Sequence, residues 1–205
     1  SVELAKIIKK TLEKVNKKFK PKIIVLASNT PSLLFREKLP NNVITILPPL
    51  GKIQKPGNVA ILTTEIVSKS KELNNYISEF NGLKDVLTIN CSELVELVES
   101  GKFLTHERDC VKTILKVLKD EFKENKIKIA TLSSTHLPFL LPFLKKYFRG
   151  VEFLDPAEDV AIKISKLEKS KSTRNSLSIY TTESPKALQR NLKSMGISNK
   201  VNLFS

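Results

Sequence analysis

Cysteine, glycine, aromatic residues and long apolar runs are all scarce in this sequence. Its 205 residues include two cysteines, six glycines and no tryptophan, and 6% are aromatic. The longest strongly apolar run, Leu137 to Leu144, has eight residues and contains proline, whereas a membrane-spanning helix needs about 20. The opening residues, Ser1-Val2-Glu3-Leu4, lack the pattern of a secretory signal. We therefore expect a globular protein without a membrane span, and its 40% hydrophobic residues suffice to fill cores.

The two cysteines, Cys91 and Cys110, lie nineteen residues apart. This spacing is not that of a metal site, and two cysteines do not make a disulfide framework. We predict that both are buried as small hydrophobic residues, that the chain holds no metal, and that it resides in the cytoplasm.

Acidic residues are too few to balance the basic ones. Lysine and arginine number 35 against 21 aspartates and glutamates, which gives a formal net charge of +14. Such an excess is typical of proteins that bind nucleic acid or another polyanion. Only five of the basic residues are arginine, however. Proteins that contact bases and phosphates directly favour arginine guanidinium groups together with aromatic rings. A solvated lysine-rich surface is therefore the favoured interpretation of the charge.

Apolar, β-branched runs alternate with segments of helical periodicity along nearly the whole chain. This alternation predicts an α/β protein with parallel sheets. Ser92 is expected to cap the helix at 93–100 and Gly101 to end it. Gly196 is expected to end the last helix, and residues 169–175 to form a polar connector. We predict strands at 22–27, 43–47, 59–64, 85–90, 126–132, 151–154, 176–182 and 201–204. We predict helices at 1–20, 31–38, 68–80, 93–100, 106–124, 138–148, 157–168 and 185–194.

Two predicted strands end in similar corners, 106 residues apart. Ser28-Asn29-Thr30-Pro31 follows the first, and Ser134-Thr135-His136-Leu137-Pro138 follows the other. Each corner places a small hydroxyl residue before a helix N-terminus, where backbone N–H groups attract a carboxylate or phosphate. Two such corners that face each other would hold a small anion between them. Alternatively, the serine and threonine residues only cap helices.

At these corners the sequence resembles the glutamate racemase family, within the aspartate/glutamate racemase superfamily. Residues 27–32 (ASNTPS) are similar to the family's A-C-N-T-A-S, and residues 132–140 (LSSTHLPFL) to its L-G-C-T-H-Y-P-L-L. Further similar stretches follow in the family's order: Thr63-Thr64-Glu65, residues 94–101 (LVELVESG), residues 155–158 (DPAE) and residues 180–185 (YTTESP).

The resemblance implies two similar parallel-sheet α/β domains with a ligand cleft between them. It suggests a discontinuous first domain, 1–48 plus 156–205, and a second domain, 49–155. It also implies racemisation by two cysteines without pyridoxal phosphate (PLP) or any other cofactor. One thiolate removes the α-proton while the opposite thiol supplies another.

Ser28 and Ser134 stand where the family has its two cysteines. A serine hydroxyl ionises far above the pKa of about 8.5 that is typical of cysteine, so almost no alkoxide is available as a base. The strand and D-S-G loop with which family members open are also expected to be absent. The sequence therefore predicts a racemase-like protein without racemase activity.

Other positions of the family's site keep their residue types. The resemblance implies that His136 and Glu99 assist the second catalytic position. It implies that Asn29, Thr30, Thr64 and Thr135 hold the ligand. The residues themselves leave simpler interpretations open, since Glu99 can be a solvated charge and His136 a helix cap.

Three functions follow as hypotheses. The first is an inactive racemase-like protein that binds an acidic amino acid or another small carboxylate. The second is an active glutamate racemase seen as a fragment or altered chain. The third is a polyanion binder, because the predicted first domain holds 19 basic and 7 acidic residues against 16 and 14 in the second. A missing strand would also leave a sheet edge unpaired, so a homo-oligomer is expected.

Overall fold

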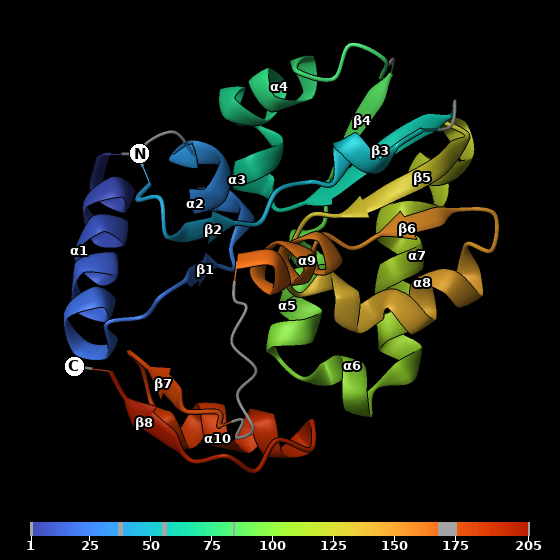
Figure 1. Cartoon of the computed structure of the whole chain (residues 1–205). Helices are drawn as coiled ribbons and strands as arrows, with labels where there is room; N and C mark the ends of the chain where they lie inside the picture. The colour runs from blue at the N-terminus through green and yellow to red at the C-terminus, as the bar shows by residue number, and fades with distance from the viewer. Residues whose placement is uncertain (1, 37–38, 55–56, 84, 168–175, 205) are drawn as a thin grey trace.

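The computed structural model of the chain describes residues 2–36, 39–54, 57–83, 85–167 and 176–204. It is an α/β protein in which every strand pair is parallel, as the sequence predicts. Figure 1 shows its three sheets: a four-stranded sheet in the middle of the chain, and a two-stranded sheet near each end of it. The connector predicted at 169–175 lies outside the described residues.

The four-stranded sheet has the order β4-β3-β5-β6. Its strands are β3 (Asn58–Thr63), β4 (Val86–Asn90), β5 (Ile127–Leu132) and β6 (Glu152–Leu154). The two inner strands are buried apolar runs, because helices cover both faces of a parallel sheet. Side chains alternate between the faces along β3, so Ala60 and Leu62 enter one core and Ile61 the other.

Helices from different parts of the chain cover the two faces (Figure 1). The larger core lies under α5 (Ser92–Glu99), α6 (Lys102–Thr105), α7 (Glu107–Glu124), η3 (Leu137–Leu140) and α8 (Leu141–Tyr147). The smaller core lies under α2 (Asn29–Leu34), η2 (Leu50–Lys52), α3 (Glu65–Ser68) and α4 (Lys71–Ser78). Since α2 precedes the four-stranded sheet in sequence, this smaller core joins the N-terminal segment to that sheet.

The N-terminal sheet pairs β1 (Ile24–Leu26) with β2 (Val43–Thr45). Beside it, α1 (Val2–Phe19) is amphipathic and buries Leu12 while its lysines stay exposed. The C-terminal sheet pairs β7 (Ile179–Thr181) with β8 (Val201–Leu203), and α10 (Pro185–Ser194) contacts both strands. The helix α9 (Ala157–Leu167) follows β6. The predicted domain boundaries at 48/49 and 155/156 stay a prediction.

Several details of the predicted elements are wrong. The helix predicted at 31–38 is α2, which begins at Asn29 and ends at Leu34. The helix predicted at 68–80 is two helices, α3 and α4, because the Ser70 hydroxyl accepts a hydrogen bond from the Leu73 N–H and starts a new helix. Ser92 is the first residue of α5 rather than its cap. The segment predicted as one helix at 138–148 begins with a 3-10 turn. Gly101 and Gly196 have φ angles of 70° and 81°, as expected for residues that end helices.

None of the described helices is both long and apolar enough to span a bilayer.

Candidate binding site at the carboxyl edge of the four-stranded sheet

Three loops meet at the carboxyl edge of the four-stranded sheet. The register pairs Leu62 of β3 with Leu132 of β5, and Thr63 of β3 with Asn90 of β4. Backbone bonds extend this alignment past the strand ends, since the Cys91 N–H donates to the Thr63 carbonyl at 2.7 Å and the Ser133 N–H to the Leu62 carbonyl at 2.9 Å. Thr64 therefore lies between the loop that carries Ser134 and the loop that follows β4.

Ser134 lies in the turn after β5 and is 7% exposed. Its Oγ is 3.4 Å from Nδ1 of His136 and 3.4 Å from the His136 backbone nitrogen. On the other side of the ring, Nε2 of His136 is 3.3 Å from Oε1 of Glu99. Glu99 reaches the ring because α5 packs against η3. Three of the predicted site residues thus form a continuous polar chain.

The other corner lies at the start of α2. Ser28 is exposed and its side chain forms no capping hydrogen bond. Asn29 is 5% exposed, and neither atom of its amide group has a partner among the described residues. Ser32 fixes this corner, because its hydroxyl donates to the Leu26 carbonyl at 3.1 Å and accepts from the Ile46 N–H at 3.2 Å. The helix α2 in turn contacts α3, which starts at the sheet edge.

Threonine hydroxyls add unpaired polar groups to the edge. The hydroxyls of Thr63 and Thr64 are buried without a partner among the described residues. Thr64 occupies the cap position of α3, but its side chain makes no capping bond there. Thr30 and Thr135 are half-buried. Three buried polar side chains therefore lack the hydrogen bonds that native proteins normally give such groups.

The third loop of this edge, after β4, was not among the predicted site residues. After β4, the Ser92 hydroxyl donates to Oδ1 of Asn90 at 2.8 Å and accepts from the Glu65 N–H at 3.0 Å. It thereby ties the start of α3 to the start of α5. The signal was available, because Asn90-Cys91-Ser92 follows a predicted strand in the same way as the other two corners.

Neither cysteine provides a reactive thiol at the carboxyl edge of the sheet. Cys91 and Cys110 are both fully buried, as predicted. Burial raises the pKa of the Cys91 thiol to about 12, and it raises the pKa of the Cys110 thiol as well. Thiols with raised pKa values are poor nucleophiles and poor metal ligands. Among the described residues, no group of three or more histidine, cysteine or acidic side chains is placed to hold a metal ion.

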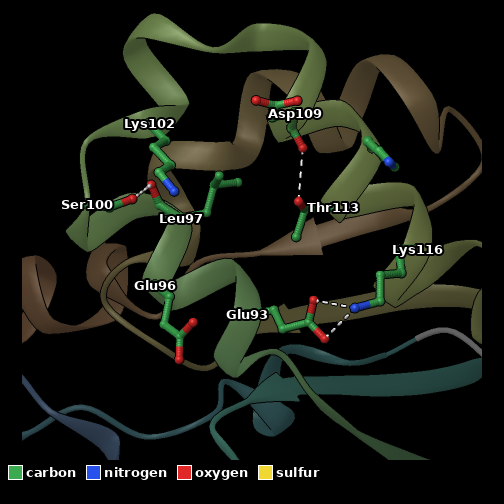
Figure 2. A pocket seen from close by; sticks show the side chains of 9 residues that line it. Glu93, Glu96, Leu97, Ser100, Lys102, Asp109, Thr113 and Lys116 are labelled. Carbon is green, nitrogen blue, oxygen red and sulfur yellow. Dashed lines mark hydrogen bonds and ion pairs between the residues drawn. The ribbon is translucent and has the colours of Figure 1, made fainter.

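A cavity lies away from this edge, between α5, α6 and α7 (Figure 2). It has a volume of about 530 Å³, and Figure 2 shows Glu93 of α5 paired with Lys116 of α7 across it. None of the predicted site residues lines this cavity. Its lining charges belong to exposed helix faces and none of them is a predicted site residue, so we assign it no role in the site.

Known proteins of one kind, the glutamate racemases, are similar to this chain in sequence. The chain is 29% identical over 167 residues to glutamate racemase 3 of Caldanaerobacter subterraneus, covering 78% of this chain and 60% of that protein. It is 28% identical over 183 residues to the glutamate racemase of Carboxydothermus hydrogenoformans, covering 85% of this chain and 68% of that protein. The chain is similar to glutamate racemases over most of its length. No family model matches it.

Solved structures show the same fold. The glutamate racemase isoform RacE1 of Bacillus anthracis aligns with all of this chain at a TM-score of 0.82 and 22% identity, over 82% of its own length. The glutamate racemase of Francisella tularensis, solved in complex with D-glutamate, aligns over 97% of this chain and 80% of its own at a TM-score of 0.74 and 18% identity. The two-domain racemase fold predicted from the sequence is confirmed. The chain spans about 60% of the length of the first relative.

Proposed function

We propose that this racemase-like chain binds an acidic amino acid, or a similar small carboxylate, at the carboxyl edge of the four-stranded sheet without inverting it. The observation that carries the proposal is the Asn29 amide. It is buried at the start of α2, and both its donor and its acceptor lack a partner among the described residues. Leaving a buried polar group unsatisfied costs about 1–3 kcal/mol, so a ligand that satisfies it gains affinity.

An amino acid offers what this amide requires. The Nδ2 of Asn29 can donate to a carboxylate, and its Oδ1 can accept from an ammonium group. The unpaired hydroxyls of Thr63 and Thr64 add further donors. The relatives named as glutamate racemases, and the D-glutamate complex of the Francisella protein, support an acidic amino acid as the first ligand to test.

The two serines are the reason that we expect no inversion of the amino acid at its α-carbon. Racemisation of an amino acid needs a base on one face of the α-carbon and an acid on the other. Ser28 and Ser134 occupy the family's two positions, and a hydroxyl does not supply a base for a weakly acidic C–H bond at neutral pH. Cys91 and Cys110 do not replace them, because both thiols are buried in the core.

Calorimetric titration tests the binding. We expect D- or L-glutamate, aspartate or a small dicarboxylate to bind the wild-type chain, and Asn29→Leu to weaken that binding by about tenfold or more. Asn81→Leu is the matched control, since Asn81 is exposed in the turn after α4. Equal affinity in the two variants, or no binding of any of these ligands, would contradict the proposal.

Proton exchange tests the absence of inversion. In deuterated water, the α-proton of bound glutamate or aspartate should exchange at the rate seen without protein. Exchange at an enzyme-like rate would instead favour the active glutamate racemase.

A second candidate function rests on α1, which carries six exposed lysines and only two acidic residues. Within the described residues none of these lysines forms an ion pair, so the helix presents a free basic face. We propose that a polyanion binds there, with affinity for single-stranded RNA or DNA that falls steeply with salt. Replacing Lys10, Lys14 and Lys17 by glutamine should abolish the binding, and unchanged binding would refute this candidate.

A further inference from the structure

The chain from Ser134 through His136 to Glu99 has the composition of a nucleophile, a base and an orienting acid. Oγ of Ser134 lies 3.4 Å from Nδ1 of His136, and Nε2 of the same ring lies 3.3 Å from Glu99. When Glu99 accepts a hydrogen bond from the Nε2–H, Nδ1 is the unprotonated nitrogen that can accept the serine proton. This is the order of groups used by serine nucleophiles in acyl transfer.

Backbone donors are available beside the same serine. In the described part of the chain, the N–H groups of Ser134 and Thr135 donate to no acceptor. The N–H of the residue after a nucleophile is a common member of an oxyanion hole. The His136 N–H points to Oγ itself, at 3.4 Å. The turn after β5 therefore supplies a hydroxyl, a base and two free donors within four residues.

We propose that Ser134 is an acyl-accepting nucleophile that reacts with activated esters of small carboxylic acids. Oγ attacks the ester carbonyl carbon while Nδ1 of His136 takes the Oγ proton. The bond from that carbon to the alcohol oxygen then breaks, and the alcohol leaves with the proton from His136. A water molecule, deprotonated by His136, attacks the acyl-serine, releases the carboxylic acid and restores the Ser134 hydroxyl.

The surroundings limit the substrate to small acyl groups. Ser134 is almost fully buried, and its neighbours on the sheet edge are the polar Thr63 and Thr64 rather than an apolar acyl pocket. An acetyl or a similarly short polar acyl group fits this description. The inference stands on the second corner alone, so it holds whether or not Asn29 binds an amino acid.

Covalent labelling tests the proposal. We expect a fluorophosphonate probe to add to Ser134 of the wild-type chain, located by peptide mass, and 4-nitrophenyl acetate to release a burst of nitrophenol. Ser134→Ala should abolish both signals, and Ser134→Cys should keep the burst. His136→Gln should slow labelling by about 100-fold or more.

The chain contains its own matched control. Its only other histidine, His106, also contacts a hydroxyl, since Oγ1 of Thr105 lies 2.7 Å from its Nδ1. His106→Gln should leave the labelling of Ser134 unchanged. If His106→Gln slows labelling as much as His136→Gln does, or if Ser134→Ala is labelled as fast as wild type, the proposal is wrong.

Glu99 acts through His136 and is a positioning residue. Its side chain is 58% exposed, so Glu99→Gln should not disturb folding. We expect this variant to lower the maximal labelling rate at least about tenfold while the half-saturating probe concentration stays unchanged. An unchanged maximal rate would show that Glu99 does not position His136. Labelling of Ser134 in a chain that binds no amino acid would refute the proposed function and leave this inference standing.

Discussion

At the scale of single residues, Asn29 is notable because its whole side-chain amide is buried and, in the described part of the chain, unpaired. Both atoms of its amide lack a partner among the described residues, although Ser32 on the same helix uses its hydroxyl twice. A fold selected only for stability would place an apolar side chain there. The amide therefore indicates a trade of stability for binding, which is common at functional sites.

Asn29→Leu should accordingly stabilise the chain while it weakens ligand binding. Replacing an unsatisfied buried amide by an apolar side chain of similar shape should raise the free energy of unfolding by about 1 kcal/mol. Urea denaturation without ligand would show this as a higher midpoint at an unchanged slope. A lower midpoint would mean that the amide has a structural role, and the argument for a trade would fail.

The thiols provide a second test at this scale. Because burial protects Cys91 and Cys110 and raises both pKa values, neither should react with a thiol reagent in the native chain at neutral pH. Both should react within minutes in guanidinium chloride. Ser28→Cys is the positive control, since Ser28 is exposed and its thiol should react at once. Rapid native labelling of Cys91 would contradict the packing described here.

At the scale of elements, one ion pair links the N-terminal segment to the four-stranded sheet. The guanidinium of Arg36, which follows α2, donates two hydrogen bonds to the carboxylate of Glu79 at the end of α4, one of them at 3.0 Å. The same guanidinium lies over the Tyr76 ring, 5.3 Å from its centre. The bond from Arg36 lowers the pKa of Glu79 below its ordinary value of 4.5.

This link should weaken in acid. A carboxyl whose pKa is lowered by folding stabilises the folded chain above its unfolded pKa, and that contribution is lost as the pH falls through the lowered value. Wild type should therefore melt at a higher temperature than Glu79→Gln at pH 7, and the difference should narrow below pH 4.5. Asp120→Asn, in the exposed face of α7, is the matched control. A difference that is constant from pH 7 to pH 3 would refute the link.

The sequence predicted the elements better than their ends. All eight strands exist where apolar β-branched runs predicted them, because burial on both faces of a parallel sheet demands such runs. The break between α3 and α4 was not predictable from periodicity, since it depends on the Ser70 hydroxyl competing for one backbone N–H. The sequence predicted which residues form the polar chain through His136, but not how close together they lie. Its distances depend on the packing of α5 against η3.

At the scale of the whole molecule, the C-terminal unit is attached to the rest of the chain through a few apolar contacts. This unit, β7 with α10 and β8, has no fully buried residue in α10. Phe19 of α1 contacts it at two rings, Tyr180 at 5.0 Å and Phe204 at 6.1 Å, and the Lys18 ammonium lies 5.0 Å from the Phe204 ring. Figure 1 shows the end of α1 beside this unit.

A second contact holds the unit from the other side, because Met195 at the end of α10 packs against the larger core of the four-stranded sheet. The C-terminal unit thus bridges α1 and the four-stranded sheet through two small apolar contacts. Aromatic pairs of this kind contribute about 0.5–1.5 kcal/mol each beyond their buried area. Such a unit should open locally without global unfolding.

Phe19→Ala should release this unit selectively. Hydrogen exchange of the backbone amides at 176–204 should speed up, while the amides of β3 and β5 keep their protection. Phe139→Ala is the control, because Phe139 is 45% exposed against 43% for Phe19 and pairs with a ring of the larger core, Phe103 at 5.9 Å. That control should leave exchange at 176–204 unchanged. In Phe19→Ala, Met195 still holds α10 against the larger core. Combining Phe19→Ala with Met195→Ala should therefore speed exchange by more than the two single effects predict. If the two effects on the exchange free energy are simply additive, the two contacts do not act together in holding the unit.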